Sequence, residues 1–192
     1  CPRLRMEAVV EALVVFEQAG KIRAIGRREV APSTLRRAAS VHPIAAVQSE
    51  YSLWTRQPEL GMLQTCAALG TAFVAFSPVG RGMLTDRPVQ VGQDLGGQFL
   101  EGNPRFMEPN LTANLGWIKG FRALAADMGV PAATLAQAWV LAKAGRGAGI
   151  SRPQPRRRRT TQVLSVDGGD ATVEVRGEAR AVKASALDEA GV

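Results

Sequence analysis

Only a few residues in this chain have side chains suited to acid–base, nucleophilic or metal chemistry. The sequence contains one histidine, His42, one tyrosine, Tyr51, and two cysteines, Cys1 and Cys66. Structural zinc sites combine several Cys or His ligands, and a Ser-His-Asp triad needs a suitably placed histidine. His42 precedes a proline, which favours a surface loop. These counts exclude the usual zinc sites and leave a Ser-His-Asp triad unsupported.

Two polar stretches each follow an apolar run that is typical of a buried strand. Gln48 to Tyr51 follow residues 44–47, and Ser77 to Gly80 follow residues 71–76. An amide side chain such as that of Gln48 both donates and accepts hydrogen bonds, and successive backbone amides can hold a phosphate. A plain strand-to-loop turn is the alternative interpretation of each stretch.

The formal charge of +7 depends largely on one short segment. Five arginines lie within a dozen residues, at Arg152 and at 156–159. Guanidinium groups suit phosphate oxygens, so this run could hold a nucleotide phosphate, and a solvated basic run is the alternative. No aromatic residues are interspersed among these arginines, so we expect no nucleic-acid partner.

Helices and strands alternate along most of the chain. Apolar spacing and glycine stops predict helices over 7–19, 32–38, 58–69, 111–128 and 132–143, and strands over 21–26, 44–47 and 71–76. A repeat of about 25 residues is typical of stacked βα units around a parallel sheet. The strands read as continuous apolar runs, which favours a sheet covered on both faces. We therefore predict an α/β fold.

The domain organisation follows from a change in composition near residue 150. Residues 1–150 form one predicted domain, which includes a long Gly- and Pro-rich loop over 81–110. Residues 151–192 are expected to form an irregular, Arg-rich tail, disordered in part, with weak alternation only near Ala171–Val175. The first residue, Cys1, indicates the middle of a longer protein. No apolar run reaches the roughly 20 residues of a membrane span, so we expect a protein of the reducing cytoplasm.

Several segments in order resemble the second half of the aldo-keto reductase family, in particular its bacterial NADP-dependent branch. They cover about two-thirds of the chain. The segments are Gly20–Gly26, Val47–Trp54, Phe73–Thr85, Asn103–Phe106 and Leu135–Leu141. The resemblance implies a partial (β/α)8 barrel that contains the fifth, sixth and seventh strands, with ligands at the carboxyl ends of the strands. A Rossmann fold has no support, because no Gly-x-Gly-x-x-Gly opens a helix after a strand.

The resemblance also implies a binding site for NADPH. Gln48 matches the residue that hydrogen-bonds the nicotinamide carboxamide, and Phe76 matches an aromatic residue that stacks on the nicotinamide ring. Ser77, Val79, Gly80 and Arg81 match the loop that holds the pyrophosphate. Glu29 completes the cofactor set near the carboxamide. Tyr51 and Trp54 are expected to line the mouth of the substrate site; packing against neighbouring residues is the alternative for both.

The chain departs from the family at several positions. The family's catalytic Tyr, Lys, Asp and His all match positions upstream of Cys1, and Tyr51 is not in the catalytic position. A small hydroxyl residue usually follows Gly26, and this chain has Arg27 and Arg28 there, of which Arg28 is expected to be a solvated charge. The Gly-Thr that usually follows the eighth strand is absent after Ile150. A shifted reading frame from about Ala144 would explain that loss.

Three functional hypotheses follow from these observations. The first is an NADPH-dependent reductase of aldehydes and ketones by descent, truncated and inactive alone. The others are a nicotinamide-nucleotide-binding regulatory module without turnover and a non-functional remnant. The expected partner is a small carbonyl compound, and no metal is expected. An incomplete barrel exposes the edges of its sheet, which favours self-association.

Overall fold

The computed structural model describes residues 4–95, 100–144 and 149–150, together with strands at 161–167, 170–175 and 178–183. The chain divides into two compact units. The first unit contains Cys1–Ser77 and Ala144–Pro153, and the second contains Pro78–Lys143 and Gln154–Val192.

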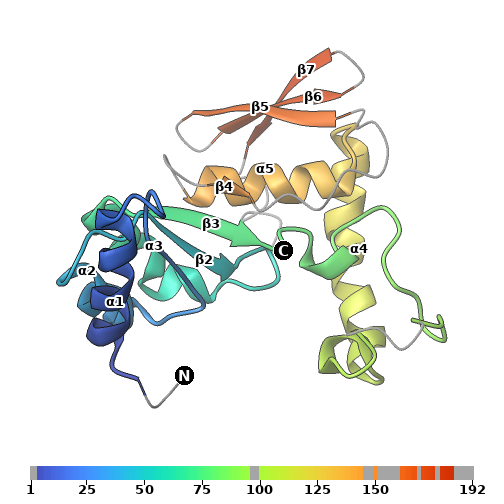
Figure 1. Cartoon of the computed structure of the whole chain (residues 1–192). Coiled ribbons are helices and arrows are strands. Elements are labelled where there is room, and N and C mark those ends of the chain that lie inside the picture. The colour runs from blue at the N-terminus through green and yellow to red at the C-terminus, as the bar shows by residue number, and fades with distance from the viewer. Residues whose placement is uncertain are drawn as a thin grey trace. The chain divides into compact units, whose positions relative to one another are not determined.

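The first unit is built on a parallel sheet with the strand order β1-β2-β3-β4. Its strands are β1 (Gly26–Arg28), β2 (Ala46–Glu50), β3 (Ala72–Phe76) and β4 (Gly149–Ile150). Its helices are α1 (Met6–Gln18), α2 (Pro32–Ala39), the 3-10 turn η1 (Gln57–Leu60) and α3 (Met62–Leu69). In Figure 1, α1 packs against α2 and α2 against α3, near the central strands β2 and β3. The predicted α/β class with a parallel sheet is confirmed, and the described strands form an open sheet.

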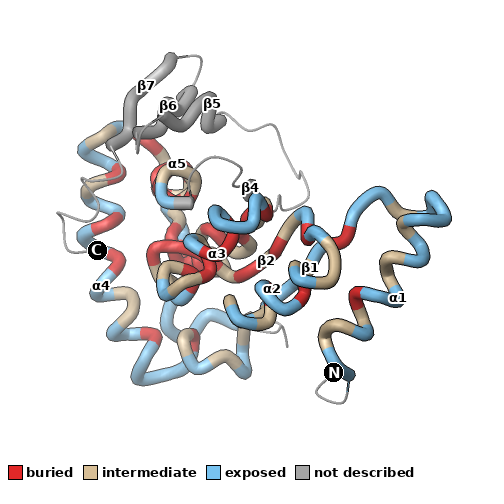
Figure 2. The backbone as a smooth tube through the Cα atoms, turned by 90° about the vertical axis from the view of Figure 1, so that its left-hand side faces the viewer, coloured by how far each residue is buried: buried red, intermediate tan, exposed pale blue. Residues whose placement is uncertain are grey.

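Local sequence explains where these helices begin and end. Pro32 occupies the first turn of α2, where its fixed φ suits the helix and its missing N–H leaves no hydrogen bond unmade. α1 and α3 are followed by Gly20 and Gly70, which have φ of 68° and 65°. Glycine reaches this left-handed region without the steric cost of a Cβ, so it ends a helix cleanly. Along α1, only Val10 is buried (Figure 2).

Three predicted boundaries of the first unit are wrong. The predicted strand over 21–26 is a loop, and β1 begins only at Gly26, where pairing with Ala46 starts. β2 starts two residues later than predicted and continues through Gln48 to Glu50, because its pairing with β3 does not depend on side-chain polarity. The helix predicted over 58–69 is split at Gly61, which has a φ of 126°.

The second unit contains two long helices. α4 (Asn110–Asp127) and α5 (Ala132–Ala144) match their predicted ranges within a residue, although the last residue of α5 falls in the first unit. Between β3 and α4 the described chain is irregular apart from two 3-10 turns, η2 (Gly80–Gly82) and η3 (Pro104–Phe106). The Asp86 carboxylate accepts a hydrogen bond from the Ala132 backbone N–H at 3.1 Å, which satisfies one free donor at the start of α5.

The C-terminal region contains more regular structure than predicted. β5 (Thr161–Asp167), β6 (Asp170–Val175) and β7 (Glu178–Lys183) form an antiparallel sheet in chain order. The expectation of an irregular tail is therefore wrong for these strands; the arginines at 152 and 156–159 lie outside the described residues. Small and charged residues dominate the segment, so its period of two is weak and the strands are hard to recognise before pairing is known.

Among the described residues, no single helix is both long and apolar enough to cross a membrane. α4 and α5 reach that length and composition only when taken together, across a bend of 94°.

Candidate functional site

Gln48 and Phe76 lie on the same face of the parallel sheet. Val47 and Ser49 of β2 are buried, whereas Gln48 and Glu50, which alternate with them, are half-buried and point to the opposite face. Glu50 pairs directly with Phe76 on β3, so Phe76 shares this second face. The two residues matched to nicotinamide binding are thus brought together, two residues apart along neighbouring strands.

The Gln48 side chain is available for a ligand. No group in the described part of the chain hydrogen-bonds its amide. A half-buried amide with both donor and acceptor unused beside an aromatic ring fits a nicotinamide carboxamide, which presents the complementary groups. The residues present therefore fit the cofactor implied by the family at these two positions.

Arg28 occupies the same face and was missed as part of the site by sequence reasoning. Its side-chain Cζ lies 5.1 Å from the centroid of the Phe76 ring, a cation–π contact. Arg28 pairs with Gln48 across β1 and β2, which puts the two side chains on one face. The sequence offered a partial indication, because Arg27 and Arg28 are adjacent and one of them had to lie on the same face of the sheet as Gln48. The register that selects Arg28 over Arg27 was unknown.

Glu29 joins the ends of β1 and β2. One of its carboxylate oxygens accepts a hydrogen bond from the Glu50 backbone N–H at 2.8 Å, and its own N–H donates to the Gln48 carbonyl at 2.9 Å. The carboxylate thus has a partner within the protein. The backbone hydrogen bond places Glu29 beside Gln48, and the assignment of Glu29 to the cofactor set stays a prediction.

Three residues of the predicted cofactor set have strained backbones. Glu29, Ser77 and Arg81 have φ of 49°, 52° and 54°, and they are the only non-glycine residues with positive φ in the described part of the chain. L-residues adopt this region rarely and at a cost of about 1–3 kcal/mol, and such strain concentrates at functional sites. Glu29 and Ser77 directly follow β1 and β3, at the carboxyl ends of two strands.

Val79, Gly80 and Arg81 form a tight turn in the second unit. The Val79 carbonyl accepts hydrogen bonds from the N–H groups of Gly82 and Leu84, at 3.1 and 3.0 Å. Met83 and Leu84 are buried and anchor the turn. The turn has the compact backbone expected of an anion-binding loop, and its binding of a pyrophosphate stays a prediction.

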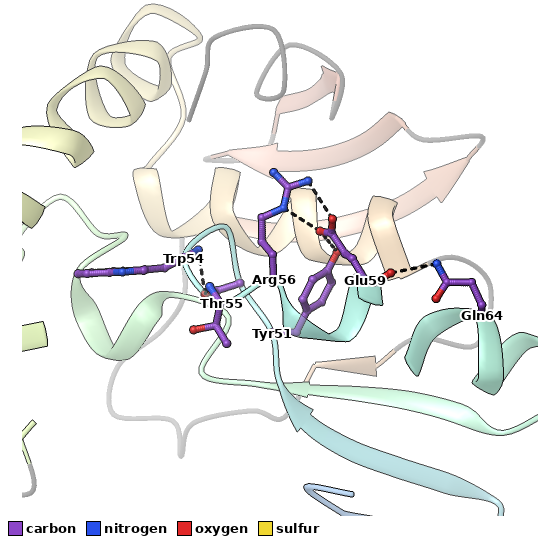
Figure 3. A network of polar contacts seen from close by, with 7 residues as sticks. Tyr51, Trp54, Thr55, Arg56, Glu59 and Gln64 are labelled. Atoms are coloured by element: carbon purple, nitrogen blue, oxygen red, sulfur yellow. Dashed lines mark hydrogen bonds and ion pairs between the residues drawn. The ribbon is translucent and has the colours of Figure 1, made fainter. Parts of the chain in front are cut away.

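Tyr51 lies in the core. It is fully buried, with its ring edge-on to Phe73 at a centroid distance of 5.7 Å. Its hydroxyl donates to the Glu59 carboxylate at 3.0 Å, and Glu59 also accepts two hydrogen bonds from Arg56 (Figure 3). Tyr51 is buried because side chains alternate between the two faces of a strand, and residue 51 continues the buried face of Val47 and Ser49. The structure gives Tyr51 a packing role in place of the predicted substrate-lining role.

Trp54 lies in a different position from Tyr51. It is half-buried in the loop after β2, and its indole extends away from the Tyr51, Arg56 and Glu59 side chains in Figure 3. The hydroxyl of Ser52 accepts hydrogen bonds from the N–H groups of Trp54 and Thr55 and holds the loop closed. The substrate-lining prediction therefore stays open for Trp54.

Two further reactive side chains of the described residues, those of His42 and Cys66, have structural roles. His42 Nε2 pairs with the carboxylate of Glu17 on α1. Cys66 on α3 is buried, and burial raises the pKa of its thiol to about 11, so the thiol is protonated and unreactive near neutral pH. The described residues contain no cluster of three or more His, Cys, Asp or Glu side chains able to hold a metal.

Comparison with solved structures gives the same fold over most of the chain. The glycerol dehydrogenase of Gluconobacter oxydans is 24% identical with a TM-score of 0.69, and the match covers 78% of this chain and 46% of that protein. A thermostable aldo-keto reductase solved with the inhibitor epalrestat is 22% identical, with a TM-score of 0.54 and coverage of 78% and 44%.

An aldo-keto reductase from Bacillus halodurans in its apo form is 20% identical with a TM-score of 0.54, and the match covers 79% of this chain and 48% of that one. This chain thus spans about half the length of the proteins that it matches. The model of the aldo/keto reductase family matches residues 2–166, well over half of the 192 residues. The chain therefore belongs to the aldo/keto reductase family.

Proposed function

We propose that this chain forms the nicotinamide-binding strand ends of a reductase barrel and binds NADPH. One observation carries the proposal: Gln48 and Phe76 share a face near the carboxyl ends of adjacent parallel strands. Ligands of (β/α)8 barrels bind at these ends. By resemblance, β1, β2 and β3 correspond to the fifth, sixth and seventh strands of such a barrel.

Residues of the first unit would each bind a different part of the nicotinamide end of the cofactor, or hold the residues that bind it. Gln48 would hydrogen-bond the carboxamide, Phe76 would stack on the ring, and Glu29 and Ser77 would hold the strand ends in the required conformation. As a separate proposal, from the family resemblance, the turn at 79–81 of the second unit would bind phosphate through its backbone N–H groups. NADPH held by these residues would offer the hydride that the reduction of a small aldehyde or ketone requires.

Reduction of a carbonyl also needs an acid that protonates its oxygen, and the tyrosine and the histidine of the described residues are both engaged in other contacts. The single tyrosine, Tyr51, is fully buried, and its hydroxyl donates a hydrogen bond to the Glu59 carboxylate. The single histidine, His42, pairs with Glu17. We therefore propose that these 192 residues bind the cofactor without turnover, and that reduction requires residues from outside them.

Titration of NADPH against the purified chain, followed by nucleotide fluorescence, tests the binding site. Gln48→Leu removes the amide and should weaken binding by up to about tenfold, the range expected for one or two lost hydrogen bonds. Gln18→Leu is the matched control, because Gln18 is exposed on α1 away from the sheet face. Binding that is absent in the wild type, or equal in all three proteins, overturns the proposal.

Turnover tests the second part of the proposal. The chain mixed with NADPH and a generic aldehyde should show no oxidation of NADPH above the rate without protein. Addition of a polypeptide that carries the half of a family barrel with the Asp, Tyr, Lys and His should give oxidation of NADPH. Reduction by the chain alone would contradict the assignment of Tyr51 and His42 to structural roles.

The exposed edges of the sheet give one further expectation about assembly. β1 and β4 are the outer strands in the described sheet order, and each has one side without a strand partner there. Unpaired strand edges tend to pair with other chains. We propose that the chain is cytoplasmic and self-associates. Sedimentation velocity over a range of protein concentrations would detect self-association as a rise in the sedimentation coefficient.

A further inference from the structure

We infer that Arg28 is a specificity-determining residue that competes with the nicotinamide ring for the face of Phe76. This inference rests on the proposed function, because it concerns the same stacking platform, the face of the Phe76 ring. The observation is the cation–π contact between the Arg28 guanidinium and the Phe76 ring, with 5.1 Å from Cζ to the ring centroid.

The contact is built by the sheet and does not depend on a flexible loop. Arg28 belongs to β1 and Phe76 to β3, and β2 lies between them in the sheet. The Arg28 side chain therefore crosses β2 on the face that carries Gln48, its direct pairing partner. The guanidinium thus lies against the Phe76 ring, on the face of the sheet that also carries Gln48.

Nothing else in the described structure holds the Arg28 charge. Arg28 is exposed and forms no ion pair with any described carboxylate. The Phe76 ring is its partner, so a ligand that stacks on Phe76 must displace the guanidinium or share the ring with it. Sharing is least favourable for a ligand that is itself cationic, because like charges repel at this distance.

The charge of the nicotinamide ring decides the expected preference. The ring is cationic in NADP+ and uncharged in NADPH. Arg28 should therefore reduce the contribution of the ring to binding in both cofactors, and more strongly in NADP+. A smaller uncharged residue at position 28 would release the platform and remove this discrimination.

The test compares ligands that share phosphates and differ in the nicotinamide. Dissociation constants are measured by calorimetry for NADPH, NADP+ and 2′-phospho-ADP-ribose, which lacks the nicotinamide, on the full chain and on Arg28→Ser. The fragment corrects for the general loss of a cation near phosphates, so the ratio of the fragment constant to the cofactor constant reports the ring alone. A residue with only a structural role would not change this ratio.

In Arg28→Ser the ratio should rise by about two- to fivefold for NADPH, the equivalent of one exposed cation–π contact, and by more for NADP+. Arg28→Gln, which keeps length without charge, should show the same direction. Arg36→Ser is the matched control, because Arg36 is an exposed arginine on α2 away from the ring. Circular dichroism confirms that each variant is folded.

The outcomes separate this inference from the proposed function. Binding of all three ligands with ratios unchanged in Arg28→Ser and Arg28→Gln overturns the role of Arg28 alone. Failure of the wild type and every variant to bind any of the three ligands overturns the proposed function, and the role of Arg28 with it.

Discussion

The strand ends of the first unit and helix α5 of the second unit use their side chains for different purposes. Around the strand ends, Gln48 and Phe76 are half-buried and Glu29 and Ser77 have positive φ. In α5, Leu135 and Trp139 are fully buried in regular helical backbone. Apolar burial is the main favourable contribution to folding, whereas positive φ in L-residues is unfavourable. Stability and candidate chemistry are therefore carried by different residues, and substitutions should separate them.

The largest effect on stability is expected in α5. Trp139→Ala removes a fully buried indole and should lower the free energy of unfolding by about 3–5 kcal/mol. Trp117→Ala on α4 is the matched control, since its side chain is 78% exposed, and should change stability by about 0.5 kcal/mol or less. Urea denaturation measures both. Similar losses in the two variants would contradict the burial of Trp139.

A smaller loss is expected from the partly buried hydrogen bond between Tyr51 and Glu59 in the first unit. Tyr51→Phe removes the hydroxyl that donates to the Glu59 carboxylate and should lower the free energy of unfolding by about 1–3 kcal/mol. NADPH affinity should stay unchanged, because Tyr51 lies on the sheet face opposite to Gln48. Denaturation and NADPH titration of the same variant measure stability and affinity independently. A change in NADPH affinity would show that Tyr51 contributes to the cofactor site.

Relief of backbone strain should act in the opposite direction. Ser77→Gly removes the Cβ from a residue with a φ of 52° and should raise the free energy of unfolding by about 0.5 kcal/mol, after the greater chain entropy of glycine is subtracted. Ser33→Gly within α2 is the control and should be destabilising, because glycine is unfavourable in a helix. Equal signs for the two variants would argue against strain at Ser77.

The smallest effect concerns an exposed ion pair far from the strand ends. The Arg37 guanidinium donates two hydrogen bonds to the Glu7 carboxylate, at 2.7 and 2.9 Å, and lowers the pKa of Glu7 from 4.5 to about 2. The lowered pKa means that the pair stabilises the fold above about pH 4.5, and that this contribution is lost as the pH falls towards 2.

Glu7→Gln should therefore slightly lower the melting temperature at neutral pH and leave it unchanged near pH 2. Glu11→Gln, on the same helix, serves as the control for loss of a carboxylate. Thermal unfolding followed across this pH range gives the comparison. A constant difference between wild type and Glu7→Gln at every pH would show that the pair does not contribute.

The site was predicted unevenly, and the reason differs from residue to residue. Gln48 and Phe76 were identified through a resemblance in short segments, and the structure places them on one face. Arg28 was expected to be a solvated charge; it is exposed, and its guanidinium also lies 5.1 Å from the centroid of the Phe76 ring. Tyr51 was expected near a substrate, yet it is buried. The contact of Arg28 and the burial of Tyr51 were not predicted, because a strand shows its two faces only when its register is known.

The residues at which the helices begin and end, and the order of helices and strands, were determined by the local sequence. Pro32, Gly20 and Gly70 begin or end helices through their own backbone preferences, which do not depend on distant residues. The face taken by each strand residue was decided only by tertiary pairing, because β1, β2 and β3 meet partners about 20 or more residues away in the sequence. That pairing turns Gln48 and Arg28 to one side of the sheet and Tyr51 to the other.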